Sequence, residues 1–297
     1  MRPIEDIISD IEAQSAQHTG QSFKSCFLQD GDALVLKTDY LLKILDALHH
    51  YFPTLESVTT YARADSITRK SLSELKVLRE HGLNHLYCGM ETGSDRVLQL
   101  INKGFDSNTV IQSGCLAKEA DMILSEFILL GIGGKEFSEE NARKTADALN
   151  IIQPDFIRVH AVGFKPESMM WQLIQDGTIS LQSEEEIVRE QRLFLQCLKE
   201  MNSYYVNEHI VNLLLEVRGD LLSEKSQMLS AINRFLNLPS EERLLFAIGR
   251  RFNMFFFLED LQKPNLRSQA QLYMDEIKKK NPNMDFADCR QSSRLTP

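Results

Sequence analysis

Apolar and polar positions along the first 165 residues predict strands and helices in regular alternation. Short apolar or β-branched runs predict strands, and stretches with an apolar residue every three or four positions predict helices. The predicted strands are Lys24 to Leu28, Ser57 to Tyr61, Leu83 to Met90, Ile123 to Leu130 and Phe156 to Val162. The predicted helices are Ile4 to Gln17, one capped by Asp39, Ser71 to Gly82, one that begins at Ser94, Ser107 to Ala120 and Ser138 to Asn150. Strands separated by helices are typical of a parallel sheet.

The pattern changes in the C-terminal part of the chain. A capping box at Ser183 to Glu186 predicts the start of a helix, and Tyr204 to Leu215 is strand-like. Helices are then predicted over Leu221 to Leu238 and Glu241 to Arg251. The run Phe252 to Leu258 is apolar enough to need cover, either by docking on the barrel or in an oligomer contact.

These patterns predict three parts. Residues 1–180 form an α/β unit, residues 181–277 a mainly helical region packed on it, and residues 278–297 a polar, proline-containing tail without stable structure. At 297 residues, with 43% hydrophobic and 25% charged residues, the chain can bury a sizeable core.

Charge and hydropathy exclude some classes of protein. The net charge of −9 argues against a nucleic-acid-binding surface. No apolar run approaches the roughly 18 residues that cross a bilayer. The N-terminus has acidic residues where a signal peptide would have positive charge and an apolar segment. We therefore expect a cytoplasmic protein without a membrane segment.

The cysteines do not predict a metal site. The five of them are far apart and odd in number, at Cys26, Cys88, Cys115, Cys197 and Cys289. Such spacing favours reduced thiols over a disulfide framework. Neither a Cys-x-x-Cys pair nor a Cys-x-x-x-Cys-x-x-Cys cluster is present, so the cysteines provide no starting pair for zinc or iron–sulfur ligation.

Glycine and charged residues gather at the carboxyl ends of the five predicted strands. In chain order these groups are Asp30-Gly31-Asp32, Arg63-Ala64-Asp65, Gly89-Met90-Glu91-Thr92-Gly93, Gly131-Ile132-Gly133-Gly134, and His160 with Gly163, Lys165 and Pro166. In a parallel barrel these ends meet on one face, where ligands bind. Glycine lets backbone amides approach a ligand, and carboxylates hold amino groups or ribose hydroxyls. The pattern predicts one shared ligand site.

Each group also has a purely structural interpretation. The run Gly131 to Gly134 can be a tight turn, Asp30 and Asp32 can cap a turn, and Glu91 can cap its own helix. Likewise, Arg63 can be a surface ion-pair residue. The recurrence at five successive strand ends favours a ligand site over these alternatives.

Taken in this order, the motifs resemble those of the radical S-adenosylmethionine superfamily. The stretch from Glu91-Thr92-Gly93-Ser94-Asp95 to Asn102-Lys103-Gly104 is the most specific. In addition, Pro166-Glu167-Ser168 and Trp171-Gln172-Leu173 are similar to the segment after the family's sixth strand. The resemblance covers about residues 3 to 180 and implies an α/β fold, a partial (β/α)6 barrel of the TIM type.

The resemblance also implies roles for individual residues. Asp30-Gly31-Asp32 matches the motif that receives the methionyl amino group of S-adenosylmethionine. Arg63 and Glu91 match positions near the methionine carboxylate and the ribose, and Gly131-Ile132-Gly133-Gly134 matches the motif along the adenine. The implied chemistry is reductive cleavage of this cofactor to a 5′-deoxyadenosyl radical, which abstracts hydrogen from a substrate.

One part of the family pattern is missing. Intact members hold a 4Fe–4S cluster with Cys-x-x-x-Cys-x-x-Cys after the first strand, and this sequence has neither that loop nor that strand. Because Cys26 and Cys88 fall on later strands, we expect no cluster ligated by this chain. The sequence is interpreted either as a shortened form of a longer protein or as a natural form without the cluster. In both cases the sheet has an extra exposed edge, where self-association is expected.

Two functional hypotheses follow, and neither establishes that this chain is an enzyme. The first is a radical S-adenosylmethionine-type protein, and the alternative is a non-catalytic module that binds S-adenosylmethionine or a nucleotide. A hydrolase or isomerase is disfavoured because no Gly-x-Ser-x-Gly elbow, His-Glu-x-x-His helix or phosphate loop occurs. Whichever of Ser125 and Glu126 points inward is expected to face an unknown substrate.

Overall fold

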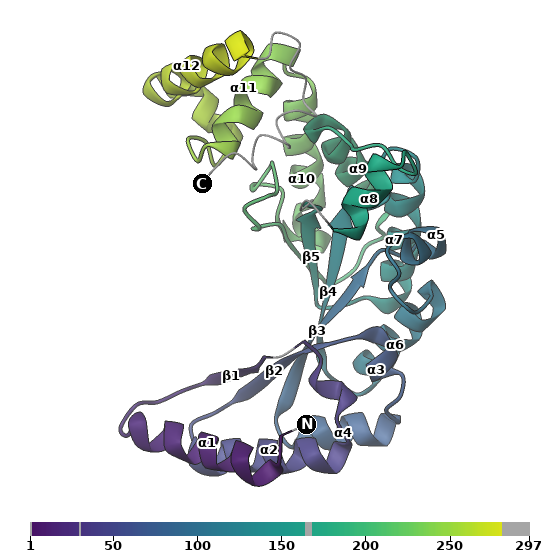
Figure 1. The fold of residues 1–297 in the computed structure, drawn as a ribbon, viewed down its shortest axis with the longest axis vertical. Coiled ribbons are helices and arrows are strands. Elements are labelled where there is room, and N and C mark those ends of the chain that lie inside the picture. The colour runs from purple at the N-terminus through teal and green to yellow at the C-terminus, as the bar shows by residue number, and fades with distance from the viewer. Residues whose placement is uncertain (1, 30, 164–167, 281–297) are drawn as a thin grey trace. The chain divides into compact units, whose positions relative to one another are not determined.

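The computed structural model describes residues 2–29, 31–163 and 168–280 (Figure 1). The chain divides into two compact units. Unit 1 comprises Met1–Met90, Phe105–Phe127 and Pro154–Phe156, and unit 2 comprises Glu91–Gly104, Ile128–Gln153 and Ile157–Pro297. The predicted boundaries at residues 180 and 277 stay predictions. Most of the predicted tail lies outside the described residues, and residues 278–280 belong to the last described helix.

Strands and helices alternate through the barrel-like part, as the sequence predicts. In chain order the elements are α1 (Ile4–Gln17), β1 (Ser25–Leu28), the short η1 (Ala33–Val35), α2 (Thr38–Tyr51), β2 (Ser57–Ala62), α3 (Ala64–Ile67), α4 (Leu72–Glu80), β3 (Leu83–Glu91), α5 (Asp95–Leu100), α6 (Ser107–Glu119), β4 (Ile123–Leu130), α7 (Ser138–Ile152) and β5 (Phe156–Ala161). All five strands are thus confirmed. One cap is wrong: α2 begins at Thr38, and Asp39 lies inside its first turn.

The C-terminal part is mainly helical. Its elements are α8 (Met169–Gln175), α9 (Glu184–Cys197), β6 (Tyr204–Val206), β7 (Gly219–Asp220), α10 (Leu221–Leu236), α11 (Ser240–Arg251), η2 (Leu258–Gln262) and α12 (Pro264–Lys280). The described strands follow the order β1 to β7, with β6 and β7 antiparallel. The α/β fold class is therefore confirmed.

In unit 1, β1, β2 and β3 are parallel neighbours. Cys26 pairs with Val58, and Tyr61 pairs with Tyr87. Figure 1 shows α1, α2 and α4 along one side of these strands. Burial alternates along β2 and β3, because successive side chains point to opposite faces. The side chains toward the helices are fully buried, among them Val58 and Leu86, whereas the other face of these strands stays partly open.

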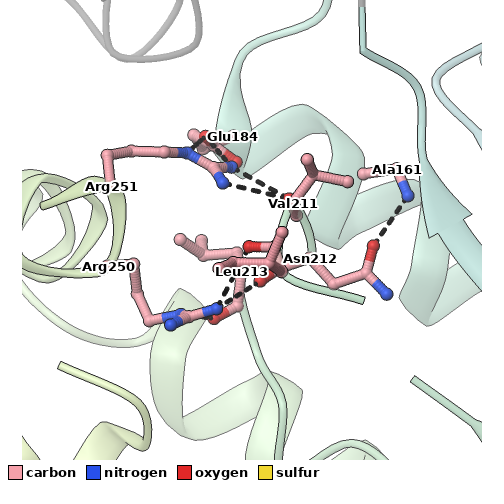
Figure 2. Close-up of polar contacts among 8 residues, drawn as sticks. Ala161, Glu184, Val211, Asn212, Leu213, Arg250 and Arg251 are labelled. Atoms are coloured by element: carbon pink, nitrogen blue, oxygen red, sulfur yellow. Dashed lines mark hydrogen bonds and ion pairs between the residues drawn. The ribbon is translucent and has the colours of Figure 1, made fainter. Parts of the chain in front are cut away.

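The predicted strand from Tyr204 to Leu215 is wrong beyond Val206. Residues 207–218 form an irregular loop instead, because side chains bind its backbone in place of a neighbouring strand (Figure 2). Asn212 Oδ1 accepts a hydrogen bond from Ala161 N at 2.7 Å, and Asn212 Nδ2 donates to the carbonyl of Val159 at 2.7 Å. The amide thus pairs with β5 as a strand backbone would.

Two arginines of α11 fix the other side of this loop, as Figure 2 shows. Arg250 is almost completely buried and donates to the carbonyls of Leu213 at 3.0 Å, Asn212 at 2.9 Å and Phe255 at 3.0 Å. Arg251 donates to the carbonyl of Val211 at 3.1 Å and forms a buried ion pair with Glu184. A planar guanidinium is suited to this task because its five N–H groups point in fixed directions.

The apolar run after α11 is only partly covered. Phe255 is fully buried and stacks on Phe246 of α11, with ring centroids 6.0 Å apart. By contrast, Phe256 and Phe257 are 47% and 40% exposed. Intramolecular docking therefore accounts for Phe255, which packs on α11.

We predict that Arg250→Met lowers the free energy of unfolding by at least about 3 kcal/mol, because several buried carbonyls lose their donor. Arg250→Lys should recover only part of this loss, since an ammonium cannot reproduce the planar fork. Urea unfolding measures both variants. Arg143→Met, at an exposed pair with Glu139, serves as the control with little expected change. Equal stability of Arg250→Met and the parent would contradict the described role of the arginine.

Candidate functional site

Glu91, the last residue of β3, has an unusual backbone conformation. Its φ is 63°, in the left-handed region that residues with a side chain rarely adopt. Such a conformation costs about 1–3 kcal/mol, and these conformations concentrate at ligand sites and active sites. This conformation turns the chain sharply at the end of β3, at the glutamate that the sequence analysis predicts to be part of a ligand site.

The residues after Glu91 are fixed by their own contacts. Gly93 N donates to Thr145 Oγ1 at 2.9 Å, and a Cβ on Gly93 would lie 2.3 Å from the carbonyl oxygen of Lys144, so only glycine fits. Ser94 caps α5 by accepting from Val97 N at 3.2 Å. The Thr-Gly-Ser part of the motif therefore serves to place α5 directly after the strand.

The end of α5 brings the chain back to Glu91. Asn102 is left-handed with φ 50°, and Lys103 N donates to the carbonyl of Leu98 at 3.0 Å, as in a Schellman motif. Lys103 Nζ then lies 2.7 Å from Glu91 Oε1. The two side chains are only 16% and 22% exposed, so this ion pair is largely shielded from water. The specific motif from residue 91 to 104 thus builds one carboxylate–ammonium pair at a strand end.

The glycine run after β4 forms a buried tight turn. Gly131 and Gly134 have φ of 80° and 64°, and Gly134 N donates to the carbonyl of Gly131 at 3.2 Å. A Cβ on Gly133 would lie 2.9 Å from the Cβ of Phe137, and Ile132 packs against Val97. The local geometry of residues 131–134 is therefore that of a tight turn. Whether this turn also lies along the adenine of a ligand stays a prediction.

A buried carboxylate holds this turn in place. Glu190 of α9 accepts hydrogen bonds from Gly131 N at 2.9 Å, Ser138 Oγ at 2.6 Å, Asn141 Nδ2 at 2.8 Å and Gln182 Nε2 at 2.9 Å. Burial raises the pKa of Glu190, against the opposing effect of these four donors. Sequence analysis missed Glu190 because its partners lie up to 59 residues away.

The strand ends of unit 1 carry a second set of candidate residues. Asp32 Oδ2 accepts from Ser66 Oγ of α3 at 2.5 Å, and its Oδ1 is buried without a hydrogen-bond partner among the described residues. Gly31 has φ 79° and open space where a Cβ would be. Arg63 Nε donates to Asp65 Oδ1 at 2.9 Å. Asp30 lies outside the described residues.

The structure therefore brings the predicted residues together in two sets. Asp32 lies at α3 in unit 1, and Glu91 pairs with Lys103 in unit 2. One cradle that joins the two sets stays a prediction. Ser125 is completely buried and lies on the same face of the sheet as His85, with its Oγ 2.9 Å from His85 Nε2, whereas Glu126, also buried, points to the opposite face.

His160 lies on β5 and is half-buried. Its ring stacks on that of His209, from the loop after β6, with centroids 4.1 Å apart. Burial lowers the pKa of His160 to about 4, and the neighbouring His209 and Arg158 lower it further. His160 is therefore neutral near pH 7. Lys165, predicted near it, lies outside the described residues.

Within the described ranges, no three His, Cys, Asp or Glu side chains are grouped so as to hold a metal ion. Cys26, Cys88, Cys115 and Cys197 form no disulfide bond with one another. A separate finding concerns membranes: no described helix combines the length and the apolar character that crossing a bilayer requires.

The chain is similar to several known proteins. No protein-family model matches the chain. The chain is 21% identical to the heme chaperone HemW of Bacillus subtilis (strain 168) over 217 residues, which are 71% of this chain and 56% of HemW. Its fold is similar to that of coproporphyrinogen III oxidase (HemN) from Escherichia coli, which is described as a radical SAM enzyme. The TM-score is 0.54 and the sequence identity is 17%, and the match covers 65% of this chain and 44% of HemN.

A second structure with a similar fold is archaeal Elp3 from Methanocaldococcus infernus with an N-terminal deletion. The TM-score is 0.50 and the sequence identity is 15%, and the match covers 66% of this chain and 51% of Elp3. The chain spans about half the length of each of these three proteins. These similarities confirm the predicted barrel-like α/β fold, which the chain shares with the structure described as a radical SAM enzyme.

We predict that Glu91→Gly is more stable than Glu91→Ala by about 1 kcal/mol, because glycine adopts the left-handed conformation without steric cost. Thermal unfolding measures the difference. Asn84, on the same strand but without a positive φ, is the control site, where alanine should be at least as stable as glycine. The same order of stability at both sites would show that Glu91 is not strained.

We also predict opposite pH dependences for two glutamates. A raised pKa in the folded state favours the protonated form of Glu190. The parent therefore loses stability as the pH rises above the unfolded pKa of about 4, and Glu190→Gln should gain stability relative to the parent over the same rise. Glu74 has its pKa lowered to about 2, chiefly by the hydrogen bond from Thr38. The stabilising effect of Glu74 is present above its unfolded pKa and is lost as the pH falls toward 2. The free energy of unfolding of Glu74→Gln should therefore fall below that of the parent as the pH rises from about 2. Urea unfolding across pH checks both, and equal slopes would contradict the assignment.

Proposed function

We propose that this chain binds S-adenosylmethionine at the carboxyl ends of its strands, as a protein of the radical S-adenosylmethionine type. The observation that carries the proposal is the shielded Glu91–Lys103 pair on a strained strand end. The ligand has a methionyl amino group, a methionyl carboxylate and ribose hydroxyls. A site for it therefore needs hydrogen-bond acceptors and a cation side by side.

Glu91 and Lys103 meet this need. The Glu91 carboxylate accepts from Lys103 Nζ through Oε1. A carboxylate has two oxygens and about four lone-pair sites, so it can also accept from a ribose hydroxyl or an amino group. Lys103 supplies a positive charge for the methionyl carboxylate.

Asp32 supports the same function in unit 1. Its Oδ1 is a buried acceptor without a hydrogen-bond partner among the described residues, which a ligand amino group would satisfy. Gly31 leaves its backbone accessible, because no other atom lies within 4 Å of the position of a Cβ. Asp30, Arg63 and the run Gly131-Ile132-Gly133-Gly134 keep the roles that the resemblance implies.

The described residues do not fit a 4Fe–4S cluster. Cys26 and Cys88 lie on β1 and β3, with β2 between them, and Cys115 lies on α6. Three thiolates that converge on one cluster are therefore not provided by these residues. We propose that the function of the described residues is to bind S-adenosylmethionine. The predicted cytoplasmic location stays a prediction.

Calorimetry with S-adenosylmethionine tests the proposal. We expect Glu91→Gln and Lys103→Met each to weaken binding by about 10- to 100-fold, because each removes a charge-assisted hydrogen bond. Glu208→Gln is the matched control, since it breaks an exposed ion pair with Arg218 elsewhere in unit 2. Equal heats from the parent and all three variants would overturn the proposed site.

A further inference from the structure

A cavity of about 690 Å³ lies beside α10 in unit 2. Its walls come from the end of the loop 207–218, from α10 and from η2. The volume falls in the range of roughly 300–1,000 Å³ that is usual for small-molecule sites. None of the lining residues belongs to the proposed S-adenosylmethionine site. They include Glu216, Arg218, Glu224, Ser230, Arg234 and Glu259.

The cavity follows α10 over several turns. Its α10 residues run from Glu224 to Arg234, which corresponds to about 15 Å along a helix. Between these two ends, Gln227 and Ser230 add polar groups, and the almost completely buried Met228 adds an apolar contact. A site of this length and composition suits an extended chain with polar groups at intervals.

Two carboxylates of the cavity are held in place by backbone N–H groups. Glu216 Oε1 accepts from Leu258 N at 2.9 Å, and Glu224 Oε2 accepts from Asp220 N at 2.8 Å. A Cβ on Gly219 would lie 2.4 Å from Glu224 Oε2, so the glycine lets this carboxylate approach the backbone closely. Both carboxylates are therefore positioned before any ligand enters.

Glu216 lacks a donor for its second oxygen. Oε2 is buried and has no hydrogen-bond partner among the described residues. Burial raises the pKa of Glu216, whereas the charge of Arg234 opposes this effect. Leaving a buried acceptor unsatisfied is unfavourable, so a ligand that donates an N–H group to Glu216 gains binding free energy.

The balance of charge in the cavity favours a cationic ligand. Both of its arginines are paired with glutamates, Arg218 with Glu208 at 2.7 Å and Arg234 with Glu259 at 2.6 Å. By contrast, neither of the two positioned carboxylates forms an ion pair with a lysine or arginine of the described chain. Negative charge is therefore in excess here, in a chain whose net charge of −9 also attracts cations.

We propose that this cavity binds a linear polyamine, a flexible aliphatic chain that carries two or more ammonium groups. One ammonium group donates to Glu216 and another pairs with Glu224, while the aliphatic carbons lie along α10 and contact Met228. This inference goes beyond the proposed function, since it concerns a second kind of ligand and uses none of the residues assigned to S-adenosylmethionine.

Calorimetry at low salt with three probes tests the chemistry of the ligand. Spermidine carries three ammonium groups and putrescine two, and 1,4-butanediol has the same four-carbon chain as putrescine with hydroxyls in place of the ammonium groups. We expect spermidine to bind most tightly, putrescine more weakly and the diol not at all. The affinity for spermidine should fall as salt is added, because salt screens the interaction between charges.

Three variants test the site itself. Glu216→Gln and Glu224→Gln should each weaken spermidine binding by about tenfold or more, because each removes a charge-assisted hydrogen bond. Ser230→Lys should weaken it similarly, since it places an ammonium group of the protein in the cavity. Ser230 is exposed, so this variant keeps the test decisive even if a change at the half-buried Glu216 prevents folding. Thermal unfolding verifies that each variant is folded.

Glu139→Gln is the matched control, because it removes the same charge from an exposed ion pair with Arg143 elsewhere in unit 2. It should leave the affinity for spermidine within about twofold of the parent. The proposal is overturned if spermidine binds no more tightly than 1,4-butanediol. It is also overturned if Glu139→Gln weakens binding as much as Glu216→Gln does, since polyamines would then bind the net charge of the chain rather than this cavity.

Two further measurements separate this proposal from its neighbours. Trilysine carries ammonium groups on a peptide, so tighter binding of trilysine than of spermidine would assign the cavity to a basic peptide and overturn the proposal. Calorimetry of Glu216→Gln with S-adenosylmethionine distinguishes the two ligands. Loss of spermidine binding with unchanged adenosyl binding supports an independent site, and parallel loss of both overturns it.

Discussion

The fold depends on one constraint: backbone N–H and C=O groups that leave the sheet must be satisfied by side chains. Glu190 accepts from Gly131 N after β4, and Thr145 accepts from Gly93 N after β3. Asn212 binds both the N–H of Ala161 and the carbonyl of Val159 on β5. Arg250 satisfies carbonyls of the loop 207–218. The loops at the strand ends are therefore fixed, and fixed loops are what a ligand site requires.

The local elements could be predicted from the sequence because their signals are local. Capping boxes at Ser71 and Ser183 give the starts of α4 and α9, and apolar runs give all five barrel strands. The loop 207–218 could not be predicted, because its β-branched residues are typical of a strand. What prevents a strand there is the binding of its carbonyls by Arg250 and Arg251, which lie nearly 40 residues later in the chain.

The candidate site was predictable by position and less so by contact. The motif from residue 91 to 104 indicated a strand end and a helix start, both of which the structure contains. That Lys103 returns to Glu91 depends on the left-handed Asn102, which no hydrophobic pattern reveals.

The short β1 limits how copies of this chain could polymerise. It has four residues and stands at one end of the described strand order. A strand of this length offers few backbone groups to an incoming chain, and the charged pair of Lys24 and Glu56 lies beside its first residue. Addition of further strands at this edge is therefore disfavoured, and so is amyloid-like stacking of copies through it.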